Sequence, residues 1–572
     1  MTSTSILVAV GGLLARVAAQ TANPTVRAAV VFINHGETTP NLVSDRAILT
    51  PNGAQQMQRL GAAFRSRYLG GTAGNATSSN SAEQAPILSL STDSIDNAQM
   101  TIMAATQEWS TNSAAAFMQG LYPPKPGTSY VGRNLALNSN TTDYPLDGYQ
   151  YAQIMTYSNS DVNSVAIQGY EACTAWQDQM SQNLSRSTEI AQRVSDKAYF
   201  YSKLFASGPM QGSLPASQAT YLNAEEIYHF VDFNYAYNET VHNSLQDPNG
   251  TLSVLQNNAF SLEKTKTSYS DKNTNTSDAA NVLYSIAGRT LADKVTDQFS
   301  TFLATSGTRG KLTLMFGSFQ TLMAFFSLAG LIDDQSAAAD AFSQLPRPGS
   351  AIAFELVGDT NSSDDFDGLQ VRFSYKPSAD AEDKFSTHPL FGSKHGGAGA
   401  YMPYTSFFSN MSEISKTPRQ WCKICSPGST ATFCLNSTLS DGQESGSSSS
   451  AISPAVAGIL GAVLTAVLIA CVAAGFAALG GWRFSRRKGG PGGPGPAGSA
   501  VGGFRGKDKM ASDADMTVSN AGRNQERVGS WELGDGRTGG AVVTGKFAQR
   551  TRAMDEDGIS ITGAPVKARE TV

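Results

Sequence analysis

A histidine followed at once by a glycine stands at the end of a short apolar run. In AAVVFINHGETTP (28–40), the apolar residues stop at Ile33 and are followed by Asn34, His35 and Gly36. A buried strand would hold such a histidine at its end, and the glycine beside it lets a ligand approach the backbone. A histidine in this setting can act as a nucleophile or carry a proton. The alternative is a histidine that is only hydrogen bonded at a strand end.

The elements that must position this histidine alternate along the chain. Apolar runs predict strands, and amphipathic or small-residue patterns predict helices. The expected strands cover 28–33, 99–105 and 311–317, the expected helices cover 50–70, 110–124 and 318–331, and an antiparallel pair covers 350–359 and 368–377. The portion from about 130 to 300 has mostly helical patterns. We therefore predict an α/β sheet flanked by helices, with a mostly helical cap insertion.

Two further features of this pattern bear on the site. The ends of strands 28–33 and 311–317 bring His35 and Ser318 to the same edge of the sheet, where such folds carry their chemistry. In helix 50–70, the small and apolar residues form the inward face, and we expect Arg65 and Arg67 to point outward.

The motifs resemble those of the histidine acid phosphatases, which have a phosphoglycerate-mutase-like fold. The family's first motif is R-H-G-x-R-x-P, and this chain has N-H-G-E-T-T-P at 34–40. The family's next helix is matched by Leu49–Thr50, Gly53, Gln56, Leu60–Gly61, Arg65 and Arg67–Tyr68, and AFMQGLYPP at 116–124 matches the block after the second motif. The resemblance covers nearly the whole segment before the C-terminal apolar run, and it is closest to the membrane-anchored fungal branch.

The resemblance implies a mechanism whose parts are mostly missing here. In the family the histidine becomes phosphohistidine, arginines bind the phosphate oxygens, and the Asp of an H-D motif protonates the leaving group. The resemblance puts the nucleophile at His35. The arginine positions hold Asn34 and Thr38, and a gapless alignment puts Met103 at the third; an alternative register uses LSTDSIDN (90–97), and neither supplies an arginine. The H-D motif falls on Ser318–Phe319.

The missing arginines and proton donor would each be expected to contribute strongly to the catalytic rate. One preorganised oxyanion donor is worth roughly 10²–10³ in rate, and general acid catalysis roughly 10²–10⁴. Two hypotheses follow: a pseudophosphatase that binds, senses or scaffolds, with a small-molecule or phosphorylated ligand, or an active acid phosphomonoesterase that uses His35. The first is favoured, and the enzyme assignment stays open.

Other candidate residues have structural interpretations as well. Glu37 is a possible substitute acid. Ser318 and Thr321 are expected to cap a helix. We expect His229 to serve packing or to lie at the surface, and His388 and His395 to lie in an exposed Gly-rich loop.

The ends of the chain predict membrane topology. Residues 1–19 resemble a signal peptide. Residues 455–481 begin with 25 residues that carry no charge, enough to cross a bilayer, and a basic cluster follows them. The predicted organisation is a 20–440 ectodomain, a Ser-rich stalk at 441–454, one transmembrane helix at 455–481 and a disordered cytoplasmic tail at 482–572, whose partner is unknown. The protein would then be a single-pass type I membrane protein of the secretory pathway.

Glycosylation signals agree with this topology. All nine Asn-x-Ser/Thr acceptors precede the apolar segment; they are Asn75, Asn140, Asn183, Asn238, Asn249, Asn275, Asn361, Asn410 and Asn436. Their one-sided distribution favours a lumenal or extracellular ectodomain.

The cysteines predict disulfides. The ectodomain has four, Cys173, Cys422, Cys425 and Cys434, which in an oxidising compartment form two bridges with three possible connectivities. Cys422-x-x-Cys425 is the alternative metal or redox motif, but no second ligand pair accompanies it. We expect no metal and no cofactor. With 42 basic against 47 acidic residues, a nucleic-acid partner is not indicated.

Overall fold

The computed structural model describes a mixed α/β body. The described residues are 25–42, 46–70, 84–125, 144–268, 279–332, 339–358, 368–392, 401–426 and 431–435. The predicted signal peptide, stalk, membrane segment and tail lie outside these residues, as do Asn75, Asn140, Asn275, Asn361, Asn436 and His395. In the part of the chain that is described, no helix is both long and apolar enough to cross a membrane.

One eight-stranded sheet forms the centre, and its order is β3-β2-β4-β1-β5-β6-β7, with β8 also paired to β6. The strands are β1 (Thr25–Asn34), β2 (Met100–Ala105), β3 (Ile154–Tyr157), β4 (Leu312–Gly317), β5 (Ala351–Gly358), β6 (Gln370–Lys376), β7 (Ser386–Thr387) and β8 (Tyr401–Pro403). β1 to β4 are mutually parallel, whereas β5 and β6 form the predicted antiparallel pair.

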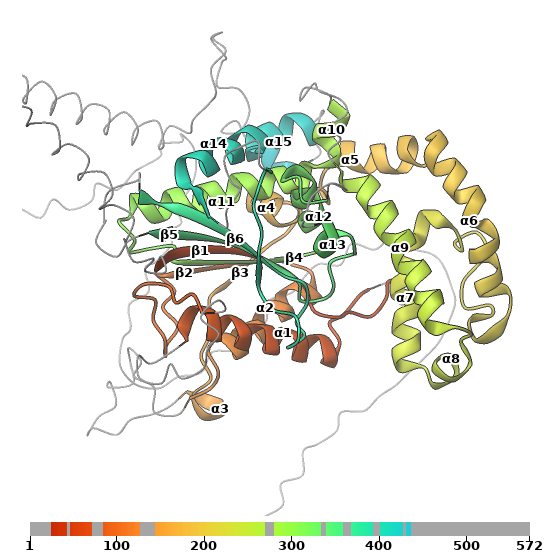
Figure 1. Cartoon of the computed structure of the whole chain (residues 1–572), viewed down its shortest axis with the longest axis horizontal. Coiled ribbons are helices and arrows are strands. Elements are labelled where there is room, and N and C mark those ends of the chain that lie inside the picture. The colour runs from red at the N-terminus through yellow and green to blue at the C-terminus, as the bar shows by residue number, and fades with distance from the viewer. Residues whose placement is uncertain are drawn as a thin grey trace, which may run out of the picture. The chain divides into compact units, whose positions relative to one another are not determined.

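Helices cover both faces of this sheet (Figure 1). The α-helices before the cap are α1 (Pro51–Phe64), α2 (Glu108–Leu121), α3 (Pro145–Gly148), α4 (Val165–Gln168) and α5 (Thr174–Asp178). Those after it are α10 (Ala279–Tyr284), α11 (Ile286–Ala304), α12 (Phe319–Leu328), α13 (Ala339–Phe342), α14 (Tyr404–Ile414) and α15 (Pro418–Cys425). α1 and α2 lie on one face, and α11, α12 and α14 on the other.

Alternation along β1 explains the two layers of core. Ala28, Val30 and Phe32 pack into the core on the α11–α12 side, while Val31 and Ile33 pack under α1 and α2. Because both faces of β1 are buried, its sequence is a continuous apolar run, which is typical of parallel strands that lie between layers of helices.

The cap is helical, as predicted. It consists of α6 (Thr188–Ala206), α7 (Ala224–Tyr237), α8 (Glu239–Ser244) and α9 (Pro248–Thr267), which share a separate apolar core. Figure 1 shows these helices beside the sheet, in yellow to green. α9 reaches the body through Ala259, which packs with Met323 of α12.

The expected outward orientation of Arg67 is wrong. Thr50 is the N-cap of α1, its side chain accepts from the Gly53 N–H, and Pro51 is the first helical residue. It ends at Phe64, and a π-helical turn, Arg65–Leu69, follows. This wider turn rotates Arg67 inward, where it is 2% exposed and pairs with Glu355 of β5 at 2.7 Å.

Candidate functional site

His35 and Ser318 lie at neighbouring strand ends. β1 ends at Asn34, whose partner in the parallel register is Gly317, the last residue of β4. The backbone N–H of His35 donates to the Gly317 carbonyl at 3.1 Å. The carboxyl edge of the sheet therefore brings the two candidate positions together.

The imidazole of His35 is held in one orientation. Its Nδ1 lies 2.7 Å from the Gly36 carbonyl oxygen, and because a carbonyl only accepts, Nδ1 carries the proton. The indole of Trp109 packs against the ring with 4.4 Å between centroids. Burial, more than the charge of His229, lowers the pKa of His35 to about 4. His35 is therefore neutral above pH 5, with the lone pair on Nε2.

The nitrogens of Asn34 are bonded to main-chain carbonyls, whereas its buried Oδ1 has no hydrogen-bond partner. Its Nδ2 donates to the Arg347 carbonyl at 3.0 Å and its backbone N–H to the Ser350 carbonyl at 2.8 Å. The Arg347 guanidinium pairs with Asp380 at 3.1 Å and with Asp383. The Arg347 guanidinium is thus neutralised by two carboxylates.

Gly36 allows a close packing of the motif loop against α1. A Cβ on Gly36 would lie 2.4 Å from the Gly53 carbonyl oxygen, so no larger residue fits without a shift of the backbone. Its N–H donates to Ser113 Oγ of α2 at 3.1 Å. The N–H of Gly36 is therefore bound to protein in this structure.

Glu37 and Thr38 connect the motif loop to the cap. The Glu37 carboxylate accepts from Thr50 Oγ1 at 2.7 Å, from Asn52 Nδ2 at 3.1 Å and from the hydroxyl of Tyr237 at 2.6 Å. Thr38 is buried, and its carbonyl oxygen lies 3.1 Å from His229 Nε2. Glu37 therefore anchors α7, and three donors already occupy its oxygens.

Met103 does not lie at the sheet edge. It faces Met315 of β4 in the register, two residues before β2 ends at Ala105. Its side chain is 1% exposed and packs in the core on the α11–α12 side. Leu90–Asn97, the alternative register, is irregular before β2, with a bend at 92–94 and a turn that starts at Asn97.

Ser318 and Phe319 begin α12. Ser318 is the N-cap residue of this helix, as expected, but its side chain makes no capping bond. Its Oγ instead lies 2.9 Å from the Tyr170 hydroxyl and bonds Gln320. Phe319 packs against α12 and α9. Thr321 Oγ1 also does not cap; it donates to the Ile167 carbonyl at 2.9 Å.

Two groups of residues near the site were not predicted from the sequence. One is the face of α7, where Glu225, His229 and Asp232 recur at helical spacing, and this spacing was the signal that could have found it. His229 contacts the motif loop, so assigning it to packing or the surface was incomplete. The other group is the loop after α4, which carries Tyr170 and Glu171.

His388 is half-buried against the Phe342 ring, contrary to the expected exposed loop.

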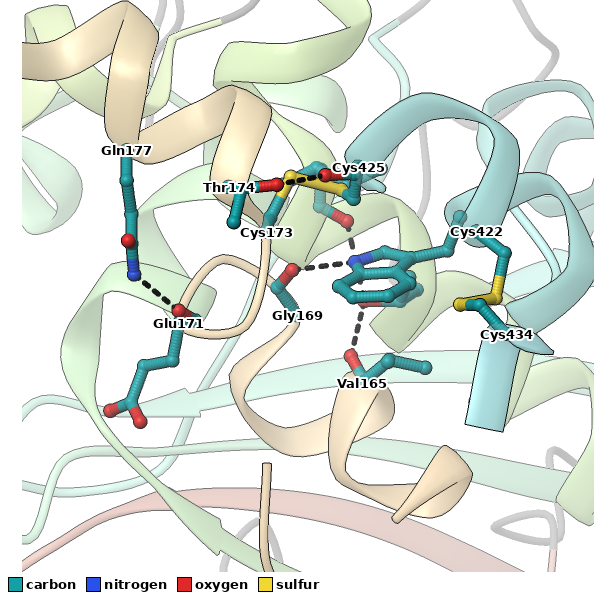
Figure 2. Close-up of a disulfide and its surroundings, with 12 residues drawn as sticks. Val165, Gly169, Glu171, Cys173, Thr174, Gln177, Cys422, Cys425 and Cys434 are labelled. Atoms are coloured by element: carbon teal, nitrogen blue, oxygen red, sulfur yellow. Dashed lines mark hydrogen bonds between the residues drawn. A yellow bond between two sulfur atoms is a disulfide. The ribbon is translucent and has the colours of Figure 1, made fainter. Parts of the chain in front are cut away.

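The C-terminal helix fixes this loop. Both predicted disulfides form, as Cys173–Cys425 and Cys422–Cys434. Figure 2 shows both bridges near Gly169. The indole N–H of Trp421 donates to the Gly169 carbonyl at 2.6 Å. Thr174 Oγ1 donates to the Cys425 carbonyl at 2.8 Å. Since Cys422 and Cys425 are both in disulfides, neither is a free metal ligand. Within the described residues, no group of three or more His, Cys, Asp or Glu side chains could hold a metal.

Comparison with known proteins gives a family model and structural likenesses. The model described as histidine phosphatase superfamily (branch 2) matches residues 34–376. No curated protein matches the chain. The phytase of Citrobacter braakii has 13% identity and a TM-score of 0.42, covering 69% of this chain and 99% of its own. The phytase of Klebsiella sp. ASR1 has 10% identity and a TM-score of 0.41, covering 69% and 97%. The phytase of D. castellii has 12% identity and a TM-score of 0.40, covering 74% and 86%.

Proposed function

Because this chain belongs to branch 2 of the histidine phosphatase superfamily, we propose that its folded part is a phosphatase-like ectodomain with impaired catalysis. Its role would be to bind, sense or scaffold rather than to hydrolyse phosphomonoesters. The observation that carries the proposal is the environment of His35. An indole lies against its ring, and Arg347, whose carbonyl accepts from Asn34, has its guanidinium paired with two aspartates.

Phosphate recognition needs positive groups aimed at its oxygens. The three positions that hold arginine in the family are Asn34, Thr38 and Met103, and none carries a charge. Asn34 is bonded to main-chain carbonyls, and Met103 lies in the core. The proton-donor position is Ser318, a hydroxyl already bonded to Tyr170. These features favour weak phosphate binding and slow turnover.

One observation favours the alternative, an active acid phosphomonoesterase. The bond between Nδ1 and the Gly36 carbonyl leaves Nε2 of His35 unprotonated, and a nucleophile needs this tautomer. The geometry of the nucleophile has thus been kept, while the groups that would stabilise the transition state have not.

We propose further that this ectodomain is glycosylated and lumenal or extracellular, in a type I membrane protein. The hydrogen bonds of Asn238 support glycosylation at this residue. Its Oδ1 caps α8 by accepting from the Thr240 and Val241 N–H groups, so Nδ2, which would carry the sugar, does not take part in the cap. Asn238 and Asn249 are both exposed.

Calorimetry with inorganic phosphate tests the proposed impairment. We expect no saturable binding by the full-length chain at pH 5 up to tens of millimolar phosphate. Saturable binding that is lost in His35→Ala would overturn the proposal, since it would mean that other groups replace the arginines.

A further inference from the structure

A polar cluster beside the candidate site has more acceptors than donors. Its members are Gln107 after β2, Asn159 after β3, and Gln168 and Glu171 on either side of Tyr170. Because β2 and β3 are parallel neighbours, the first two residues follow strand ends at the same edge as His35. The cluster is therefore part of the same edge of the sheet.

Two amide nitrogens of the cluster donate to Glu171, and the third donates to one of these two amides. Glu171 Oε2 accepts from Gln107 Nε2 at 2.9 Å and from Asn159 Nδ2 at 3.3 Å. Gln168 Nε2 donates in turn to Asn159 Oδ1. This chain of donors fixes the amide orientations, since turning any one of them would bring two oxygens together.

Two buried amide oxygens are left without a donor. Gln107 Oε1 and Gln168 Oε1 have no hydrogen-bond partner, and Gln168 is only 4% exposed. The oxygen and nitrogen of an amide share one carbon, so each orphan oxygen lies beside a nitrogen that points into the cluster. An unsatisfied buried acceptor costs about 1–3 kcal/mol, so such groups are normally paired.

The cluster is open on one side and fixed on the other. Asn159 is exposed and Glu171 is partly exposed, so a ligand can reach the carboxylate. The segment that carries Gln168 and Glu171 is held by the Trp421–Gly169 bond and the Cys173–Cys425 bridge. In Figure 2 the Glu171 carboxylate points away from this bridge, while its carbonyl accepts from Gln177. The acceptors are thus preorganised.

We propose that this cluster binds a primary ammonium group, between the Glu171 carboxylate and the amide oxygens of Gln107 and Gln168. An ammonium has three N–H donors and no acceptor, and it carries the charge that complements Glu171. Phosphate would instead bring negative charge next to the Glu171 carboxylate. The proposal deepens the binding role proposed above and rests on it, since it makes an amine-bearing small molecule the ligand of this edge.

Calorimetry on the full-length chain with n-butylamine as the probe tests this site. We expect saturable binding at pH 7, at least about 10-fold weaker binding by Glu171→Gln, and a similar loss in Gln168→Met. Asp178→Asn is the matched control, because it removes an exposed carboxylate from the same segment and should leave the affinity unchanged.

The chemistry of the ligand is tested by two analogues. Butyltrimethylammonium keeps the charge but has no N–H donor, and n-butanol keeps the chain but has no charge; neither should bind. Binding of either as tightly as n-butylamine, equal affinity of Glu171→Gln and wild type, or no amine binding would overturn the proposal. If Glu171→Gln does not fold, Gln168→Met still decides the outcome. A phosphatase assay on the same samples separates the two proposals, since turnover would contradict impaired catalysis without affecting amine binding.

Discussion

The indole of Trp109 lies against the imidazole of His35, with 4.4 Å between ring centroids and 50° between ring planes. An apolar ring thus covers part of the residue that would attack phosphorus. Trp109 contributes to the burial that keeps His35 neutral, but its indole carries no positive charge to complement a phosphate. The contact therefore buries the residue at the family's nucleophile position without supplying the positive charge that phosphate binding requires.

Acid should destabilise the fold partly through His35. Unfolded His35 has a pKa of 6.5, and burial lowers it to about 4 in the folded chain. As the pH falls between these values the unfolded state takes up the proton first, so the free energy of unfolding decreases. Urea titrations at pH 7 and pH 4 should show a smaller loss for His35→Asn than for wild type. The exposed His242→Asn is the control, and equal losses in all three proteins would contradict the burial of His35.

Replacement of Gly36 by alanine should be strongly destabilising. The Cβ of an alanine at position 36 would lie 2.4 Å from the Gly53 carbonyl oxygen. Neither atom can move away by a side-chain rotation, so the backbone would have to shift. We expect a loss of about 1–3 kcal/mol or more in urea unfolding. At Gly368 nothing lies within 4 Å of an added Cβ, so Gly368→Ala should change stability by less than about 0.5 kcal/mol. Similar effects for the two variants would refute the close packing of the motif loop.

The buried ion pair between Arg67 and Glu355 should matter far more than a surface pair. Arg67 is 2% exposed, and its removal leaves the Glu355 charge with fewer partners in the core. Arg67→Ala should cost about 3–5 kcal/mol. In the surface pair, Lys125 and Asp93 are both more than half exposed, so Lys125→Ala should cost at most about 1 kcal/mol. Chemical denaturation compares them, and a small effect of Arg67→Ala would mean that the residue points outward after all.

The two disulfides should differ in their effect on stability. Cys173–Cys425 joins residues 252 apart in sequence, and Cys422–Cys434 joins residues 12 apart. On the chain-entropy account the first stabilises by about 5 kcal/mol and the second by about 3 kcal/mol. The double variants Cys173→Ala/Cys425→Ala and Cys422→Ala/Cys434→Ala should therefore differ in Tm, the first being lower. If the Cys422→Ala/Cys434→Ala variant had the lower Tm, native packing rather than chain entropy would determine how much each disulfide stabilises the fold.

Much of the fold could be predicted from the sequence because its signals are local. The strand at His35, the helix after Thr50 and the antiparallel pair β5–β6 follow from periodicity and capping. The burial of Arg67 could not be predicted, because it depends on a π-helical turn and on Glu355, 288 residues later. β3 was also missed, since its four residues, Ile154–Tyr157, carry too short a pattern.

The part of the site that could be predicted from the sequence is the part with local signals. His35, Gly36 and Ser318 follow strand ends, which the sequence marks. Trp109, His229 and Tyr170 reach the site through tertiary packing, and no local pattern records which side chain meets which. The disulfide pairing likewise needed the distances in the folded chain.

The most direct measurement of the central claim is turnover of a generic aryl phosphate by the full-length chain, with His35→Ala in parallel, between pH 4 and pH 7. We expect wild type and His35→Ala to be indistinguishable from each other and from buffer. Hydrolysis by wild type well above that of His35→Ala would contradict impaired catalysis and identify His35 as a working nucleophile.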